Sequence, residues 1–151
     1  MTPKRLIVLA VLIVLAVRAA AAGSPDLARA AAWHPIREGI RVTVGEEAVT
    51  ASYKVVTGQP AGAALMIPPG TLAGLETLKL RIRGSRNAQL VVSLRDAAGV
   101  VYAFPAVPVR VGGAREVEVS VADLTYLAPQ SSAPDPGSFD PAKTVMITLL
   151  D

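Results

Sequence analysis

The chain has 151 residues, no cysteine, and 15 lysines and arginines against 12 aspartates and glutamates. Without cysteine no disulfide can stabilise the fold, so a hydrophobic core of ordinary size must do so. The formal net charge of +3 does not indicate a nucleic-acid-binding surface, because three of the basic residues fall in an N-terminal segment that contains no acidic residue.

Residues 1–22 have the layout of a secretory signal peptide. Two basic residues precede an unbroken apolar run over residues 6–17, and small residues follow it up to Ala22. The run is shorter than the roughly 20 residues that a membrane span needs, and Arg18 would interrupt a span extended through the alanines. We therefore expect cleavage near Ala22 rather than an uncleaved anchor, export to the periplasm or the cell exterior, and no stable membrane insertion afterwards.

Removing this leader also removes Lys4, Arg5 and Arg18, so the mature chain carries 12 basic against 12 acidic residues. Its net charge is near zero and indicates neither nucleic acid nor an acidic partner. The mature length of about 130 residues suits a single domain. We expect residues 23–38 to form a lead-in and residues 39–151 to form that domain.

A short helix is predicted in the lead-in, over residues 24–33. Ser24 is a favourable N-cap, and Pro25 suits the first helical position. Pro35 should end the helix, and we expect Trp33 to pack on the domain.

From residue 40 onward the chain shows only strand patterns and loops. Alternation of apolar and polar side chains, or short apolar runs between turn residues, predicts strands at 40–44, 49–56, 63–67, 78–83, 90–94, 100–104, 115–121 and 144–150. If the strand at 78–83 neighbours the strand at 115–121, Glu116 and Glu118 should face its three basic side chains. Prolines in the segment 105–108 exclude a central strand there and indicate a bend or an edge.

Few residues could support catalysis or hold a metal. His34 is the only histidine and no Gly-x-Ser-x-Gly motif is present, so we expect no enzyme. Glu116 and Glu118 lie roughly 7 Å apart on one strand face, a spacing that glycoside hydrolases use, but any solvated strand face has it, which favours a structural role. No cofactor or metal site is predicted, although loop carboxylates such as Asp96 and Asp135 leave a structural calcium ion open.

The order of strands and turns over residues 75–83, 91–102, 115–124 and 139–151 resembles the jelly-roll sandwiches of the galactose-binding-like fold, which include many carbohydrate-binding modules. This resemblance covers about half of the mature chain. It implies an all-β jelly-roll β-sandwich of antiparallel strands. Binding members tend to present several aromatic side chains on a concave face, whereas this sequence has one Trp, three Tyr and two Phe.

The turn at residues 96–99 has two registers that place Tyr102 differently. A four-residue loop puts Tyr102 opposite Ser93, on a polar face beside Arg95, where both Tyr102 and Arg95 would belong to a binding surface. A three-residue loop puts it opposite Leu94, in the core. Turn chemistry alone does not choose between them, and we favour the core.

The longest segment without periodicity, residues 122–143, carries Tyr126 and Phe139, which we predict to be an exposed pair. The sequence thus predicts an exported, non-catalytic binding module for a glycan or cell-envelope polysaccharide, with Tyr126, Phe139, Tyr102 and Arg95 as candidate ligand-binding residues. The alternative is a structural or protein-interaction β-sandwich domain of an envelope or secreted assembly, with an envelope protein as partner.

Overall fold

The computed structural model describes residues 16–18, 27, 32–45 and 48–151, and it is built from β-strands joined by loops and single 3-10 turns. The strands are β1 (Ala16–Arg18), β2 (Trp33–Pro35), β3 (Ile40–Val44), β4 (Val49–Tyr53), β5 (Gly62–Met66), β6 (Thr77–Ile82), β7 (Ala88–Asp96), β8 (Val101–Ala103), β9 (Val107–Val109), β10 (Arg115–Ser120), β11 (Thr125–Tyr126) and β12 (Thr144–Leu150). The 3-10 turns are η2 (Val121–Asp123), η3 (Ala128–Gln130) and η4 (Pro141–Lys143). Every strand expected from the sequence pattern is present, with ends shifted by a few residues.

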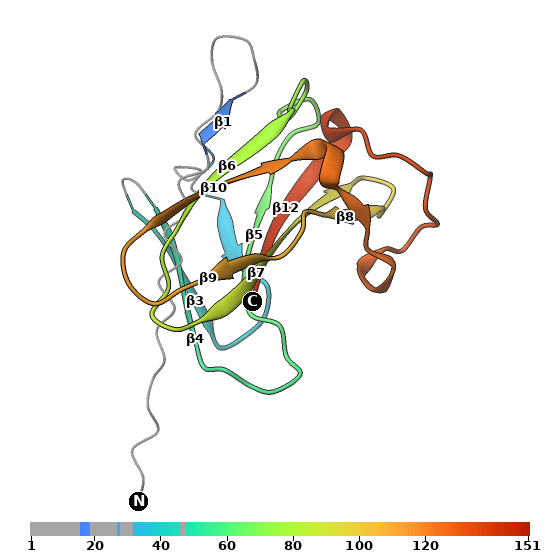
Figure 1. Ribbon diagram of the computed structural model, residues 1–151. Coiled ribbons are helices and arrows are strands. Elements are labelled where there is room, and N and C mark those ends of the chain that lie inside the picture. The colour runs from blue at the N-terminus through green and yellow to red at the C-terminus, as the bar shows by residue number, and fades with distance from the viewer. Residues whose placement is uncertain (1–15, 19–26, 28–31, 46–47) are drawn as a thin grey trace, which may run out of the picture.

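The strands form two layers. The larger sheet has the order β11-β8-β7-β12-β5-β2, and β9 pairs with the start of β7. The second layer consists of the sheet β1-β6-β10 and the hairpin β3-β4, and β6 and β10 lie in front of β5 and β12 in Figure 1. All of these strand pairs are antiparallel, so the chain is an antiparallel β-sandwich as predicted.

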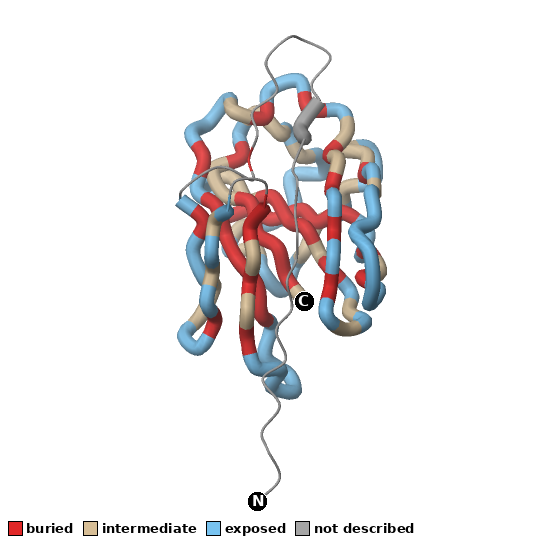
Figure 2. The backbone as a smooth tube through the Cα atoms, turned by 90° about the vertical axis from the view of Figure 1, so that its left-hand side faces the viewer, coloured by how far each residue is buried: buried red, intermediate tan, exposed pale blue. Residues whose placement is uncertain are grey.

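The core lies between the two layers and is filled by alternate residues of each strand, because successive side chains of a strand point to opposite faces. From the second layer, Leu78, Leu80 and Ile82 of β6 point inward, and each is at most 4% exposed. Leu94 of β7 and Ile147 of β12 meet them from the larger sheet in the same cluster. Figure 2 shows this buried region running through the middle of the molecule, with exposed loops around it.

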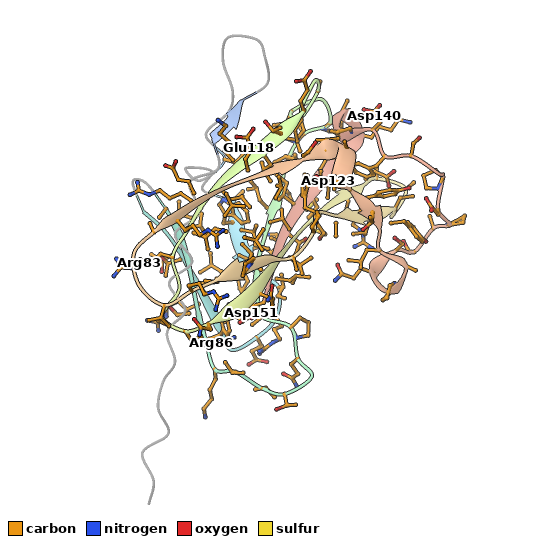
Figure 3. All side chains as sticks on the ribbon, viewed as in Figure 1. Arg83, Arg86, Glu118, Asp123, Asp140 and Asp151 are labelled. Atoms are coloured by element: carbon orange, nitrogen blue, oxygen red, sulfur yellow. The ribbon has the colours of Figure 1, made fainter. Side chains whose placement is uncertain are left out.

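Opposite charges pair on the outer face of the second layer. In the register of β6 and β10, Glu116 lies opposite Arg81 and Glu118 lies opposite Lys79. The Lys79 Nζ to Glu118 Oε2 distance is 3.3 Å, as the sequence predicted. Both side chains are solvated, so the pair contributes at most about 1 kcal/mol to stability. Glu118 projects from β10 away from the core in Figure 3, which supports the structural role expected for the two glutamates.

The β7-β8 hairpin adopts the three-residue loop. Asp96 N donates to the carbonyl oxygen of Val100 at 3.1 Å, and Leu94 lies opposite Tyr102. Gly99 has a φ of 89°, a conformation that a side chain would strain. Tyr102 is therefore directed to the inner face of the sheet and is 6% exposed, which confirms the favoured register.

A polar network ties the β3-β4 hairpin to the larger sheet. The Asp151 carboxylate accepts hydrogen bonds from the Tyr53 hydroxyl and from the Arg86 guanidinium, and Arg86 and Asp151 lie close together in Figure 3. Burial raises the pKa of Tyr53 above its ordinary value, because a phenolate would lose its hydration there.

The lead-in differs from the prediction where it is described. Trp33 and His34, expected at the end of a helix, belong to strand β2, which pairs with β5 at the edge of the larger sheet. The sandwich therefore includes residues that precede the predicted domain start at 39. The indole of Trp33 is 6% exposed and donates to the carbonyl oxygen of Leu27 at 2.8 Å. Backbone hydrogen bonds to β5 hold these residues in a strand. The local residues that favoured a helix contain no information about this distant partner. Of the rest of the predicted helix, only Leu27 and Ala32 are among the described residues.

Most of the predicted signal peptide also lies outside the described residues. Its described part, β1, pairs with β6, and Ala16 lies opposite Lys79. Within the described part of the chain, no helix has the length and apolar character to cross a membrane.

Candidate functional site

The outer face of the larger sheet carries a row of mostly small side chains. Cross-strand pairing places one residue from each of β2, β5, β12, β7 and β8 in this row: His34, Ala64, Thr148, Ser93 and Ala103. Paired residues of adjacent strands point to the same face, and this face is opposite to the one that carries Leu94 and Ile147 into the core. Because most of these side chains are small, the middle of the outer face is recessed.

A groove of about 510 Å³ lies over this row. Its lining comes from β2, β5, β12, β7 and β8 and from the loops that flank them: His34, Pro35, Ile36, Pro60, Ala64, Ser93, Arg95, Val101, Gln130, Met146, Thr148 and Leu150. Its volume is within the range of small-molecule and oligomer sites in proteins. The groove therefore has a floor built from regular strands and walls built from loops.

Hydrogen bonds to the backbone hold both walls in place. On one side, Arg37 Nε donates to the carbonyl oxygen of Pro60 at 2.8 Å. On the other side, Ser131 Oγ accepts from Val101 N at 2.9 Å, and Leu127 N donates to the carbonyl oxygen of Val101 at 2.8 Å. These contacts position the loop that contributes Gln130 to the groove.

Arg95 is the charged residue of the groove that the sequence had predicted for ligand binding. It lies opposite Met146 and Val101 on the outer face, and its Nη2 lies 3.4 Å from the carbonyl oxygen of Gln130. At the other end of the groove, His34 Nδ1 lies 3.2 Å from the carbonyl oxygen of Ala32. A carbonyl can only accept, so this contact requires the proton on Nδ1 and makes Nε2 an acceptor in the neutral ring.

The three predicted aromatic residues lie elsewhere, in a cluster on the inner face of the sheet edge. Tyr126 lies opposite Tyr102 in the β11-β8 pair, with the two rings edge to face at 5.8 Å. Phe139 packs on Tyr102 from the other side, with ring centroids 5.2 Å apart. Figure 1 shows the loop that carries Phe139 folding around β8.

The prediction that Tyr126 and Phe139 form an exposed pair is therefore wrong, since both are half-buried. Tyr102 points inward but lies beyond the main core cluster. The rings of Tyr126 and Phe139 shield its ring from water instead. The Tyr126 hydroxyl donates to the carbonyl oxygen of Ala133 at 2.7 Å. Within the long loop, Tyr126 and Phe139 thus pack against Tyr102, and their role in ligand binding stays a prediction.

Asp135 closes this aromatic cluster. Its carboxylate accepts hydrogen bonds from the Tyr102 hydroxyl and, at 2.9 Å, from Gly137 N. The hydrogen bond to Asp135 raises the pKa of Tyr102 to about 12 from an ordinary 10.0. The same bond is the main reason why the pKa of Asp135 falls below its ordinary 3.8.

We expect the stability of the protein to depend on pH at both ends of the range because of this pair. The depressed pKa of Asp135 stabilises the fold above pH 3.8 and this contribution is lost as the pH falls further. The raised pKa of Tyr102 stabilises it below pH 10.0, and this contribution is lost as the pH rises toward about 12. Thermal melting across the pH range should show both losses, and Asp135→Asn and Tyr102→Phe should each reduce them. Melting profiles parallel to that of the wild type would contradict this assignment.

Four of the loop carboxylates considered for a calcium ion have partners among the described residues. Asp96 Oδ1 accepts from Val100 N at 2.9 Å, and Asp140 Oδ1 accepts from Ala142 N at 3.0 Å. Asp135 and Asp151 bind side chains, as described above. Among the residues that the structure describes, no three acidic, histidine or cysteine side chains lie close enough to share a metal ion.

The sequence predicted Arg95 but missed most of the groove. Ser93 and Thr148 lie on the outer faces of two predicted strands, so the alternation of side chains could have predicted which face they occupy. The sequence could not predict that they are neighbours, because β7 and β12 are distant in sequence and pair only in the folded chain. His34 and Gln130 join them from segments without a strand pattern.

Comparison with known proteins bears on the fold. Neither a protein-family model nor a curated protein matches the sequence. Among solved structures, the chain is similar to the family 11 carbohydrate-binding module of the cellulosomal cellulase Lic26A-Cel5E of Clostridium thermocellum, with a TM-score of 0.62 and 15% sequence identity over 86% of this chain and 85% of that chain. At this identity the similarity establishes the architecture, which is a jelly-roll β-sandwich as the resemblance to the galactose-binding-like fold implied.

Proposed function

We propose that this chain is a non-catalytic glycan-binding module and that the groove on the outer face of the larger sheet is its binding site. The observation that carries the proposal is the groove itself, about 510 Å³ in volume and lined from five strands. A module with the same architecture that binds carbohydrate is known, which supports the proposal without identifying the ligand.

The lining chemistry suits a carbohydrate. A sugar ring presents apolar C–H faces and hydroxyl edges, so a complementary site combines apolar surface with hydrogen-bonding groups. Ala64, Met146 and Leu150 supply apolar surface, and Arg95 and Gln130 supply donors and an acceptor. Strands form the floor, so little conformational entropy is lost when a ligand binds.

Export to the periplasm or the cell exterior belongs to the same proposal, since polysaccharide ligands of this kind lie outside the cytoplasm. The basic start, apolar run and small residues of positions 1–22 support it. Mass spectrometry of the protein recovered from culture would give the N-terminal residue of the mature chain.

Filling the groove should abolish binding. Ala64 lies on the floor of the groove, and Ala64→Phe places a ring in the space that a ligand would occupy. In affinity electrophoresis against a panel of neutral and anionic polysaccharides, we expect the wild type to be retarded by at least one of them. We expect Ala64→Phe to weaken that binding by about tenfold or more, which corresponds to about 1.4 kcal/mol.

Ala114→Phe is the matched control, because Ala114 is exposed and lies outside the groove. It should bind as the wild type does. Met146→Trp places a larger ring in the groove and replaces the first variant if Ala64→Phe melts at a much lower temperature. Retardation of the blocked variants equal to that of the wild type would refute the groove as the site.

A further inference from the structure

We infer that the ligand of the groove is an anionic polysaccharide, one that carries carboxylate or sulfate groups. This inference rests on the proposed function and adds the chemical class of the ligand. Three observations support it. The charged lining of the groove is positive, the Arg95 guanidinium has no carboxylate partner among the described residues, and no aromatic side chain lines the groove.

The charged lining of the groove has one sign. Arg95 stands near one end of the groove, and no aspartate or glutamate is part of the lining. This asymmetry is local, because the chain without its predicted leader has equal numbers of acidic and basic residues. The groove is therefore an electropositive site on a protein that has little net charge of its own.

Ion pairs between described residues engage two of the basic side chains. Lys79 pairs with Glu118 at 3.3 Å, and Arg86 pairs with Asp151. Arg95 forms no such ion pair with a described residue, and the hydrogen bond from its guanidinium goes to the carbonyl oxygen of Gln130 at 3.4 Å. A guanidinium has five N–H donors, so most of its donor capacity remains for a ligand.

A neutral ligand would use this arginine poorly. When a ligand covers the groove, the guanidinium loses water, and a hydroxyl group returns only part of the lost hydration energy. A carboxylate or sulfate returns more, because charge-assisted hydrogen bonds to arginine are about twice as strong as neutral ones. The surrounding apolar side chains, such as Val101 and Met146, lower the local dielectric and strengthen this attraction.

The groove also lacks the side chains on which a neutral sugar ring could stack. No Trp, Tyr or Phe is part of its lining. Trp33 packs toward the core, and Tyr102, Tyr126 and Phe139 pack against one another on the inner face. Charge and hydrogen bonds must therefore supply most of the affinity.

The test compares polysaccharides that share a backbone and differ in charge. Affinity electrophoresis with polygalacturonate against its methyl ester isolates the carboxylate, and dextran sulfate against dextran isolates the sulfate. We expect retardation by the anionic member of at least one pair and little by its neutral partner. Binding should weaken as salt is added, because the ions screen the contact.

Arg95→Gln should reduce binding of the anionic polymer by about tenfold or more, in line with the loss of a hydrogen bond between charged groups. Arg81→Gln is the matched control: Arg81 is exposed on the second layer and its removal changes net charge equally, so binding should stay near that of the wild type. Equal losses in the two variants would show non-specific attraction and overturn the inference.

The outcomes separate the inference from the proposed function. Retardation by neutral polysaccharides, blocked by Ala64→Phe and unaffected by Arg95→Gln, would overturn the anionic ligand while leaving the glycan-binding groove in place. Retardation by no polysaccharide, neutral or anionic, would overturn both.

Discussion

Leu94→Ala is expected to lower the free energy of unfolding by about 2–5 kcal/mol, the range for truncating a fully buried leucine. Leu94 has no exposed surface. It lies between Tyr102 on one neighbouring strand and Ile147 on the other, so the space left by its side chain cannot be filled without moving two strands. Urea denaturation followed by tryptophan fluorescence would measure the loss, because Trp33 belongs to the same core cluster.

Val91→Ala on the same strand is the control for this prediction. Val91 is only half-buried and its side chain points to the outer face, so its truncation should cost about 1 kcal/mol or less. Shifting β7 by one residue against β12 would exchange the two faces of β7. If Val91→Ala proved more damaging than Leu94→Ala, the register of β7 and β12 would be wrong.

Gly62→Ala is expected to destabilise the protein by about 1–3 kcal/mol, as overpacking of a well-packed interior does. A Cβ at position 62 would lie 1.8 Å from the carbonyl oxygen of Leu149 and 2.8 Å from its carbonyl carbon. These atoms belong to the backbone of β12, the strand that joins β5 to β7, so no side-chain rotation relieves the clash. The melting temperature in differential scanning calorimetry would report the effect.

Gly113→Ala is the matched control for the glycine. A Cβ there meets nothing within 4 Å, and the residue lies outside the left-handed region. Alanine at such a site restricts the unfolded chain, so the variant should be as stable as the wild type or up to about 1 kcal/mol more stable. A melting temperature for Gly62→Ala equal to that of Gly113→Ala would contradict the close approach of β5 and β12.

The sequence predicted those parts of the fold that rest on local alternation. The strand at residues 77–82 carries its own signal, and the charges of Glu116 and Glu118 indicated its neighbour correctly. The jelly-roll architecture was implied by the resemblance to the galactose-binding-like fold, and the structural comparison confirms it. The strand order of the larger sheet did not, because β12 lies between β5 and β7 and an apolar run contains no information about which strands flank it.

The candidate site shows the same division. Arg95 could be placed on the outer face because it follows the inward-pointing Leu94 along β7, and its role in binding stays a prediction. Tyr126 and Phe139 were misplaced because the proline-rich composition of their loop indicates exposure, whereas the inward orientation of Tyr102 requires a cover that only tertiary packing reveals. His34 entered the groove through β2, whose pairing with β5 is non-local.

The groove as a glycan site is tested most directly by mapping backbone amide chemical shifts while an oligosaccharide of the polymer that retards the protein is added. We expect the largest changes at the amides of the groove floor, Ala64, Ser93, Arg95 and Thr148, and none at β6 or β10. Changes confined to β6 and β10, or to the loop around Phe139, would contradict the groove and place binding on another surface.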